Sequence, residues 1–149
     1  MTARKLYGIF LITLGSVAFL ASCISQLLWF WPRKAIQVDP AQVAYVTFTS
    51  ASVYFESTDR ALITDLAARC NSLSVRPYYY SPDAMVLGGS AISFSMKNGT
   101  HQAITFFSPQ SIRFTGDGGL YVWWLVSGEF DLEPYREYGR THELWDTWL

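Results

Sequence analysis

The longest run of apolar positions lies at the start of the chain. Residues 6–31 contain no charged side chain over 26 positions, and a helix of that length would extend roughly 39 Å, against about 30 Å for the hydrocarbon core of a bilayer. The run ends with Trp29, Phe30 and Trp31, and Pro32, Arg33 and Lys34 follow, which is typical of an aromatic belt and then basic residues at a membrane interface. We therefore expect residues 1–34 to form a single-pass membrane anchor in contact with lipid, and residues 35–149 to form one domain.

The same residues also fit a secretion signal. Residues 1–5 are basic, residues 6–19 are apolar, and residues 20–23 (Leu-Ala-Ser-Cys) resemble the lipobox of bacterial lipoproteins, in which the cysteine is acylated. In lipoproteins the chain usually becomes polar after that cysteine, whereas residues 24–31 here stay largely apolar. An uncleaved signal anchor is thus the leading interpretation, and lipidation of Cys23 or ordinary cleavage are the alternatives.

The flanking charges predict the orientation of the anchor, and its small residues predict a contact with another helix. Two basic residues on each side of the apolar run nearly balance the positive-inside count, but a short basic N-terminus usually stays inside, so we expect an extracytoplasmic domain, in a bacterial envelope. A stripe of small side chains at helical spacing would let another membrane helix approach closely; it comprises Gly8, Gly15, Ala18, Ser22 and Ser25.

After an extended linker at residues 35–40, the pattern changes to one of strands and one long helix. Alternating apolar positions predict a strand over residues 43–48, with residues 52–55 continuing it or pairing with it. Ser57 or Thr58 is then expected to cap a helix that runs to about Leu73, with Asp59 near the positive end of the helix dipole.

The second half of the chain predicts hairpins. Residues 91–97 and 101–107 flank Asn98-Gly99, which is typical of a type I′ turn, and residues 111–115 and 120–126 come next as further strands. The tail, residues 131–149, predicts one or two short helices, interrupted around Gly139. The expected fold is α+β: a transmembrane helix followed by a small domain in which a four- to five-stranded antiparallel meander packs on one main helix, with a short C-terminal helix.

Aromatic residues are the most suggestive candidates for a binding site. Tyr78, Tyr79 and Tyr80 lie in a predicted loop between two prolines, and the strand neighbours Trp123 and Trp124 must point to opposite faces of the sheet. An exposed tryptophan beside a tyrosine-rich loop would form a stacking surface for a sugar or an anchor for a protein. The alternative is that Trp145 or Trp148 of the tail covers that tryptophan.

The charges exclude one class of partner and suggest another. The net charge of −1 conceals a basic N-terminal segment and a folded part with a net charge of −5, in which no cluster of lysine and arginine appears, so nucleic acid is not an expected partner. An acidic segment precedes the C-terminus and offers a docking surface for a basic protein; its candidate residues are Glu129, Asp131, Glu133 and Glu137. In the other interpretation these carboxylates form a solvated face.

Signs of catalysis are weak. Residues 142–146, His-Glu-Leu-Trp-Asp, resemble the His-Glu-x-x-His helix of zinc proteases but carry aspartate where the second histidine belongs, and His101 has no nucleophile at a recognisable spacing. Cys70 falls on the apolar face of the predicted helix, where a buried structural thiol is expected. We therefore expect no enzyme, cofactor or metal site, but a membrane-anchored accessory or binding domain; the alternative is an immunity or inhibitor protein that acts through the acidic segment and the aromatic loop.

Overall fold

The computed structural model describes residues 3–51, 53–80, 89–115 and 121–142, which form two compact units, residues 1–31 and 32–149. The first unit is helix α1 (Ala3–Phe30). Its segment Tyr7–Phe30 has 24 residues and a mean hydropathy of 2.0, and none of it is buried against protein. The expected helix is therefore present and is long and apolar enough to cross a membrane; a signal sequence has the same properties.

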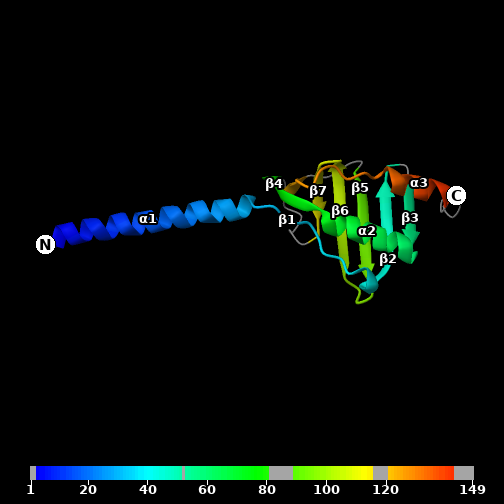
Figure 1. The fold of residues 1–149 in the computed structure, drawn as a ribbon, viewed down its shortest axis with the longest axis horizontal. Coiled ribbons are helices and arrows are strands. Elements are labelled where there is room, and N and C mark those ends of the chain that lie inside the picture. Colours follow the sequence, from blue (N-terminus) through cyan, green and yellow to red (C-terminus); the bar gives the residue numbers. More distant parts are fainter. Residues whose placement is uncertain (1–2, 52, 81–88, 116–120, 143–149) are drawn as a thin grey trace. The chain divides into compact units, whose positions relative to one another are not determined.

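The second unit is an α+β domain built on one antiparallel sheet (Figure 1). The strand order is β1-β4-β8-β7-β6-β5-β2-β3, so the expected meander β5 to β8 is confirmed, and β2 joins it as predicted. The strands are β1 (Arg33–Lys34), β2 (Val43–Ser50), β3 (Val53–Ser57), β4 (Ser74–Tyr80), β5 (Ser90–Met96), β6 (His101–Ser108), β7 (Ser111–Phe114) and β8 (Tyr121–Leu125). The prediction of four to five strands was wrong, because the sheet has eight.

Of the three additional strands, β3 pairs with β2, one of the two arrangements expected for residues 52–55, whereas β1 and β4 come from segments with weak or misleading patterns. Residues 74–80 form β4 instead of a loop, and Val75 pairs with both Arg33 of β1 and Leu125 of β8. In the described part of the chain, β1 pairs only with Val75 and Ser74, so no described strand needs an N–H from Pro77. A register shift follows between Pro77 and Tyr79. Arg33 and Lys34, which the sequence assigns to the anchor, thus pair with the folded unit.

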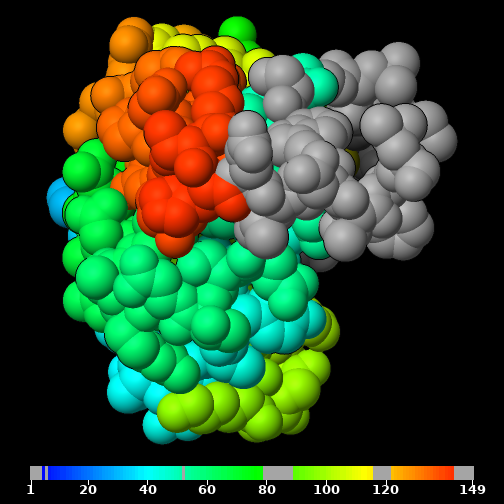
Figure 2. All heavy atoms as spheres, turned by 90° about the vertical axis from the view of Figure 1, so that its right-hand side faces the viewer, coloured from blue at the N-terminus to red at the C-terminus, as the bar shows by residue number. Residues whose placement is uncertain are grey.

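Two helices cover one face of the sheet. Helix α2 (Arg60–Ser72) begins after Asp59, whose carboxylate accepts a hydrogen bond from Ala61 N at 2.9 Å, so the cap is Asp59 and not Ser57 or Thr58. Helix α3 (Glu133–Thr141) contacts β3. The view in Figure 2 shows α3 (red) next to α2 (green) on the surface of the molecule. The Tyr135 hydroxyl joins them by donating to Asp65 at 2.8 Å.

The core lies between these helices and the alternate residues of the strands. Matching rows cross the sheet, for example Phe55, Phe48, Ile92, Ile104 and Phe114, each of which is paired with the next. The fully buried side chains with the largest volume are Trp123, Phe48, Phe55 and Phe94. The alternation of inward-facing and outward-facing positions along the strands therefore produces one covered face and one outer face.

The predicted linker is part of this core. Ala35, Ile36 and Val38 are buried, and the Asn71 side chain of α2 pairs with the backbone of Val38, accepting from its N–H at 2.7 Å and donating to its C=O at 2.8 Å. A short 3₁₀ helix, η1 (Pro40–Gln42), then leads into β2. Residues 35–40 are thus fixed to the domain rather than acting as a linker.

Two glycines have roles that differ from those predicted. Gly99 N donates to Met96 O at 2.9 Å, so Lys97 and Asn98 are the central turn residues, and Gly99, with φ of 83°, comes after them. The hairpin is as expected, but the turn is the three-residue form instead of type I′. Gly139 does not interrupt the C-terminal helix but lies within α3, where an added Cβ would meet the Phe55 ring at 2.9 Å.

Candidate functional site

The outer face of the sheet brings two of the predicted aromatic residues together. Tyr78 on β4 and Trp124 on β8 have ring centroids 5.4 Å apart, and Tyr78 is 60% exposed. Trp123 is fully buried on the opposite face, which confirms that the two tryptophans point in opposite directions. The tilted Tyr78–Trp124 pair is therefore the part of the predicted aromatic site that the described surface presents.

The other predicted aromatic residues lie elsewhere. Trp123 packs at 5.3 Å from Phe114 and has the Arg33 guanidinium 4.0 Å from its ring centroid, so it belongs to the core. The side chains of Tyr79 and Tyr80, and the residues Trp145 and Trp148 considered as a cover, lie outside the described residues.

Two arginines extend the aromatic pair across neighbouring strands. Arg76 is exposed and is paired with Trp124 in the β4–β8 register. Arg113 on β7 has its guanidinium carbon 5.7 Å from the ring centroid of Phe107 on β6. Strands β4, β8, β7 and β6 are consecutive in the sheet, and we call their outward-facing rings and arginines the basic–aromatic patch; it consists of Arg76, Tyr78, Phe107, Arg113 and Trp124.

Sequence reasoning missed this combination of charge with aromatic rings. The arginines stand 37 positions apart in the chain, so no basic cluster is visible along it. The available signal was strand parity: an arginine between two inward-facing residues, as Arg113 is between Ile112 and Phe114, must point to the outer face.

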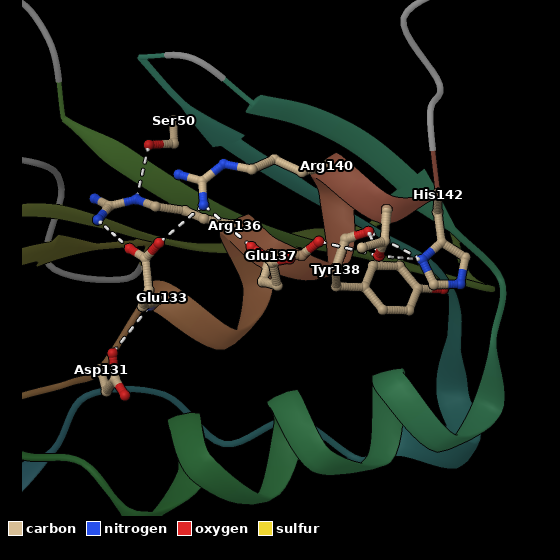
Figure 3. Close-up of polar contacts among 9 residues, drawn as sticks. Ser50, Asp131, Glu133, Arg136, Glu137, Tyr138, Arg140 and His142 are labelled. Atoms are coloured by element: carbon tan, nitrogen blue, oxygen red, sulfur yellow. Dashed lines mark hydrogen bonds and ion pairs between the residues drawn. The ribbon is translucent and has the colours of Figure 1, made fainter.

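The acidic segment forms contacts within the molecule (Figure 3). The Glu133 carboxylate forms ion pairs with Arg136 Nη1 at 3.2 Å and with Arg140 Nη1 at 3.0 Å. Arg140 Nη1 also lies 3.2 Å from Glu137 Oε2. Hydrogen bonds from Arg136 and then Arg140 lower the pKa of Glu133 below its usual value. These ion pairs link side chains on the surface of α3 and are solvent-exposed, so each contributes little to stability.

The remaining two predicted carboxylates also have internal partners. Asp131 accepts a hydrogen bond from Glu133 N at 2.9 Å, as a residue at a helix start does, and Glu129 accepts from the Gln110 amide at 2.9 Å. An inhibitor that bound a basic protein through this segment would have to replace several of these contacts. The structure thus brings all four predicted residues together, along the start and the first two turns of α3.

A pocket of about 390 Å³ opens beside this segment, where the β6–β7 turn meets the chain that leads into α3. Arg136 crosses it and donates to the hydroxyls of Ser50 and Ser90, at 3.3 Å each. Phe106 and Phe130 provide apolar walls, with ring centroids 4.8 Å apart. Three of the four acidic candidates also line the pocket, so its lining combines apolar and charged side chains.

Helices α2 and α3 enclose the most strongly shifted titratable groups. Burial, and then the hydrogen bond to Asp65, raises the pKa of the Tyr135 hydroxyl. Burial raises the pKa of the Cys70 thiol to about 12, which confirms a buried structural thiol and makes it a poor nucleophile.

Among the described residues, the two histidines make local contacts. Across the β5–β6 hairpin, Ser95 Oγ lies 3.1 Å from His101 Nδ1, a pairing that the sequence spacing did not reveal. His142 stacks on Tyr138 with ring centroids 4.0 Å apart, and its Nδ1 lies 2.9 Å from Tyr138 O. Glu143 and Asp146 of the zinc-protease-like motif lie outside the described residues. Within the described part of the chain, no group of three histidine, cysteine or acidic residues could hold a metal ion.

The remaining candidates lie on α1. The predicted stripe of Gly8, Gly15, Ala18, Ser22 and Ser25 is helical throughout, and nothing in the described structure lies within 4 Å of a Cβ added at either glycine. Cys23 is a free thiol on the same helix.

Comparison of the chain with protein families, curated proteins and solved structures finds no match.

Proposed function

We propose that the chain is a membrane-anchored, non-enzymatic accessory domain that stays attached to α1 and binds its partner outside the cytoplasm of a bacterial cell. The observation that carries the proposal is the apolar segment Tyr7–Phe30, none of which is buried against protein. Exposed apolar surface on this scale is unfavourable in water and is satisfied by lipid. The folded unit has a core of its own, formed by residues from Ala35 to Tyr135.

The binding role is supported by the outer face of the sheet. One face is covered by α2 and α3, whereas the other presents the Tyr78–Trp124 pair and the two arginines. Aromatic residues and arginine are the residue types enriched at interaction surfaces. We assign the contact surface to the basic–aromatic patch and a helix-packing role to the stripe of Gly8, Gly15, Ala18 and Ser22.

Membrane extraction and protease accessibility test the anchor. The full chain, expressed in bacteria, is washed with alkaline carbonate, its intact mass is measured, and protease is added to cells and to spheroplasts. We expect the protein to remain in the membrane with all 149 residues and with its domain cleaved from the outside. As matched variants, Leu14→Arg places a charge within α1 and should release protein into the wash, whereas Leu14→Ile should not.

Two results would overturn the proposed anchor. A chain that begins at an acylated Cys23 would show a lipoprotein, and a shorter soluble chain would show a cleaved signal. A domain protected from protease in spheroplasts would instead place it in the cytoplasm and reverse the proposed orientation.

A further inference from the structure

We propose that Asn98 is a site of spontaneous covalent modification, at which the chain loses ammonia, closes a succinimide ring with Gly99 and reopens it with water to aspartate or isoaspartate. The reaction needs no enzyme and no cofactor, and its co-reactant is water. The site lies on the β5–β6 turn and does not depend on the use of α1 as an anchor.

The turn presents Asn98 to water. Residues 97–101 are all exposed, and the turn lies at the lower end of the sheet (Figure 1). Gly99 has no side chain to shield its main-chain nitrogen, and apart from its chain neighbours no described atom lies within 4 Å of a Cβ added there. The electrophile, which is Asn98 Cγ, and the nucleophile, which is Gly99 N, therefore both lie in an open part of the surface.

Two donors already point at the oxygen that becomes charged during ring closure. Asn98 Oδ1 accepts hydrogen bonds from Thr100 N at 3.0 Å and from Thr100 Oγ1 at 2.7 Å. When Gly99 N adds to Asn98 Cγ, negative charge develops on Oδ1, and hydrogen bonds to a charged oxygen are stronger than those to a neutral one. Donors that are in place before the reaction lower its barrier as an oxyanion hole does. The turn therefore assists the addition step.

Ring closure and reopening balance with water alone. Gly99 N gives its proton to hydroxide and bonds to Asn98 Cγ, after which the Cγ–Nδ2 bond breaks and Nδ2 leaves as ammonia with a proton from water. A water molecule then adds to one of the two ring carbonyls. Opening at the side-chain carbonyl gives aspartate, and opening at the main-chain carbonyl gives isoaspartate, in which the main chain runs through Cβ and Cγ. No group is oxidised or reduced.

One hydrogen bond of the turn opposes the reaction. Gly99 N donates to Met96 O at 2.9 Å, and this contact has to open before the nitrogen loses its proton and turns towards Asn98. Hydrogen bonds at an exposed hairpin tip open far more often than those in the middle of a sheet. This contact therefore slows the reaction without preventing it.

The chain contains one other asparagine, which provides an internal control. Asn71 lies in α2, and its amide is held at both ends, because Oδ1 accepts from Val38 N and Nδ2 donates to Val38 O. The residue after it is Ser72 and not a glycine. Asn71 would have to break two hydrogen bonds and a turn of helix to form the ring, so we expect it to remain an amide.

The two products differ in their effect on the turn. Aspartate keeps an oxygen for Thr100 and adds a negative charge next to Lys97, whose Nζ donates to Ala41 O at 2.8 Å. Isoaspartate adds one atom to the main chain of the turn, directly after Lys97 N, which donates to Gln42 O at 2.8 Å. Older copies of the protein would thus carry an altered charge and an altered turn at this end of the sheet.

Incubation of the full chain in heavy-oxygen water tests the site. The purified chain in detergent is kept at a mildly alkaline pH, either folded or unfolded in urea. Peptide mass mapping follows loss of ammonia and gain of heavy oxygen at positions 98 and 71, and chromatography separates the aspartate and isoaspartate peptides. Thr100→Val removes the hydroxyl donor, and Thr100→Ser, which keeps it, is the matched control.

We expect position 98 of the folded chain to give both products with heavy oxygen, while position 71 stays unchanged. Thr100→Val should slow the reaction of the folded chain about fivefold, as for the loss of one hydrogen bond, and Thr100→Ser should react like the native chain. In urea all three chains should react at the same rate, because the turn that aligns the donors is lost. A turn that was merely loosened would react faster, so the direction of the change separates the role of the hydroxyl from a folding defect.

Three results would contradict this assignment. Position 98 of the folded chain stays intact over a time in which the chain in urea converts fully, or folded Thr100→Val reacts as fast as the native chain or faster. The third is formation of aspartate without isoaspartate, which would indicate direct hydrolysis of the amide without a ring.

Discussion

The two faces of the sheet are built from the same strands but differ in their surroundings: one is buried and the other is partly exposed to solvent. On the covered face, Trp123 is fully buried in the core together with phenylalanine and isoleucine from neighbouring strands. On the outer face, the next residue, Trp124, contacts a tyrosine that is 60% exposed and stands opposite an exposed arginine.

The difference lies in what each face is packed against. The covered face holds rows of apolar side chains because two helices exclude water from it, and each buried side chain contributes free energy roughly in proportion to its apolar area. On the outer face, aromatic rings lie next to arginine side chains instead of beneath a helix. Substitutions on the two faces should therefore differ in whether they affect stability or binding.

The largest expected difference is between the two neighbouring tryptophans. Trp123→Ala should lower the free energy of unfolding by about 3–5 kcal/mol, because it leaves a cavity in a core that cannot fully close. Trp124→Ala should cost about 1 kcal/mol or less, as is usual for a partly exposed residue. Denaturant unfolding of the full chain in detergent, followed by circular dichroism, measures both. Equal costs would mean that the two faces are equally covered.

The pH dependence of stability tests the burial of α2. The folded-state pKa of Cys70 is raised from 9.0 to about 12, so the folded state keeps a proton that the unfolded state loses in this interval. Stability should then fall as the pH rises from about 9 towards 12, by about 1 kcal/mol per pH unit for this group.

Two variants separate the contributions to that slope. Cys70→Ala should remove its part of the alkaline loss, and Tyr135→Phe should remove the part that comes from the raised pKa of the tyrosine. An unchanged slope in Cys70→Ala would show that the thiol is open to solvent.

The contact between α3 and the edge of the sheet predicts an intermediate effect. Gly139→Ala places a methyl group against Val53 and Phe55 and should cost about 1–3 kcal/mol through overpacking. In the double variant with Val53→Ala, part of that cost should disappear, because the smaller side chain makes room. A double-mutant cycle from denaturant unfolding measures the coupling, and strict additivity would contradict the close approach.

The smallest effect is expected for the ion pairs on the surface of α3. Glu133→Gln removes contacts with Arg136 and Arg140, which are solvent-exposed and contribute little. Because the pKa of Glu133 is lowered in the folded state, its stabilising contribution should be present near neutral pH and lost as the pH falls through that lowered pKa. The difference in Tm between Glu133→Gln and the native chain should therefore vanish in acid. A difference that persists in acid would indicate another role for Glu133.

Much of the fold is predictable from local pattern. The apolar run identifies α1, the Asn98-Gly99 pair marks a hairpin, and strand alternation places Trp123 and Trp124 on opposite faces. These features depend on residues close together in the chain, so they can be predicted from the sequence.

The errors arise where long-range packing outweighs a local signal. Pro77 and three consecutive tyrosines indicate a loop, yet β4 forms because β8 and the short strand β1 pair with it. Gly139 indicates a helix break, yet the helix continues because only a glycine lets α3 approach Val53 and Phe55 so closely. The basic–aromatic patch is likewise assembled from four strands, and only the sheet order brings its residues together.

Pro77 also affects how copies of this protein can associate. An unpaired strand edge invites another chain to add a strand. Among the described residues, only the two residues of β1 pair with β4 on this side. Proline lacks the N–H that such an addition requires, and the register shift after it distorts the edge further. In the proposed membrane-anchored form, Pro77 would hinder two neighbouring chains from joining their sheets through this part of β4.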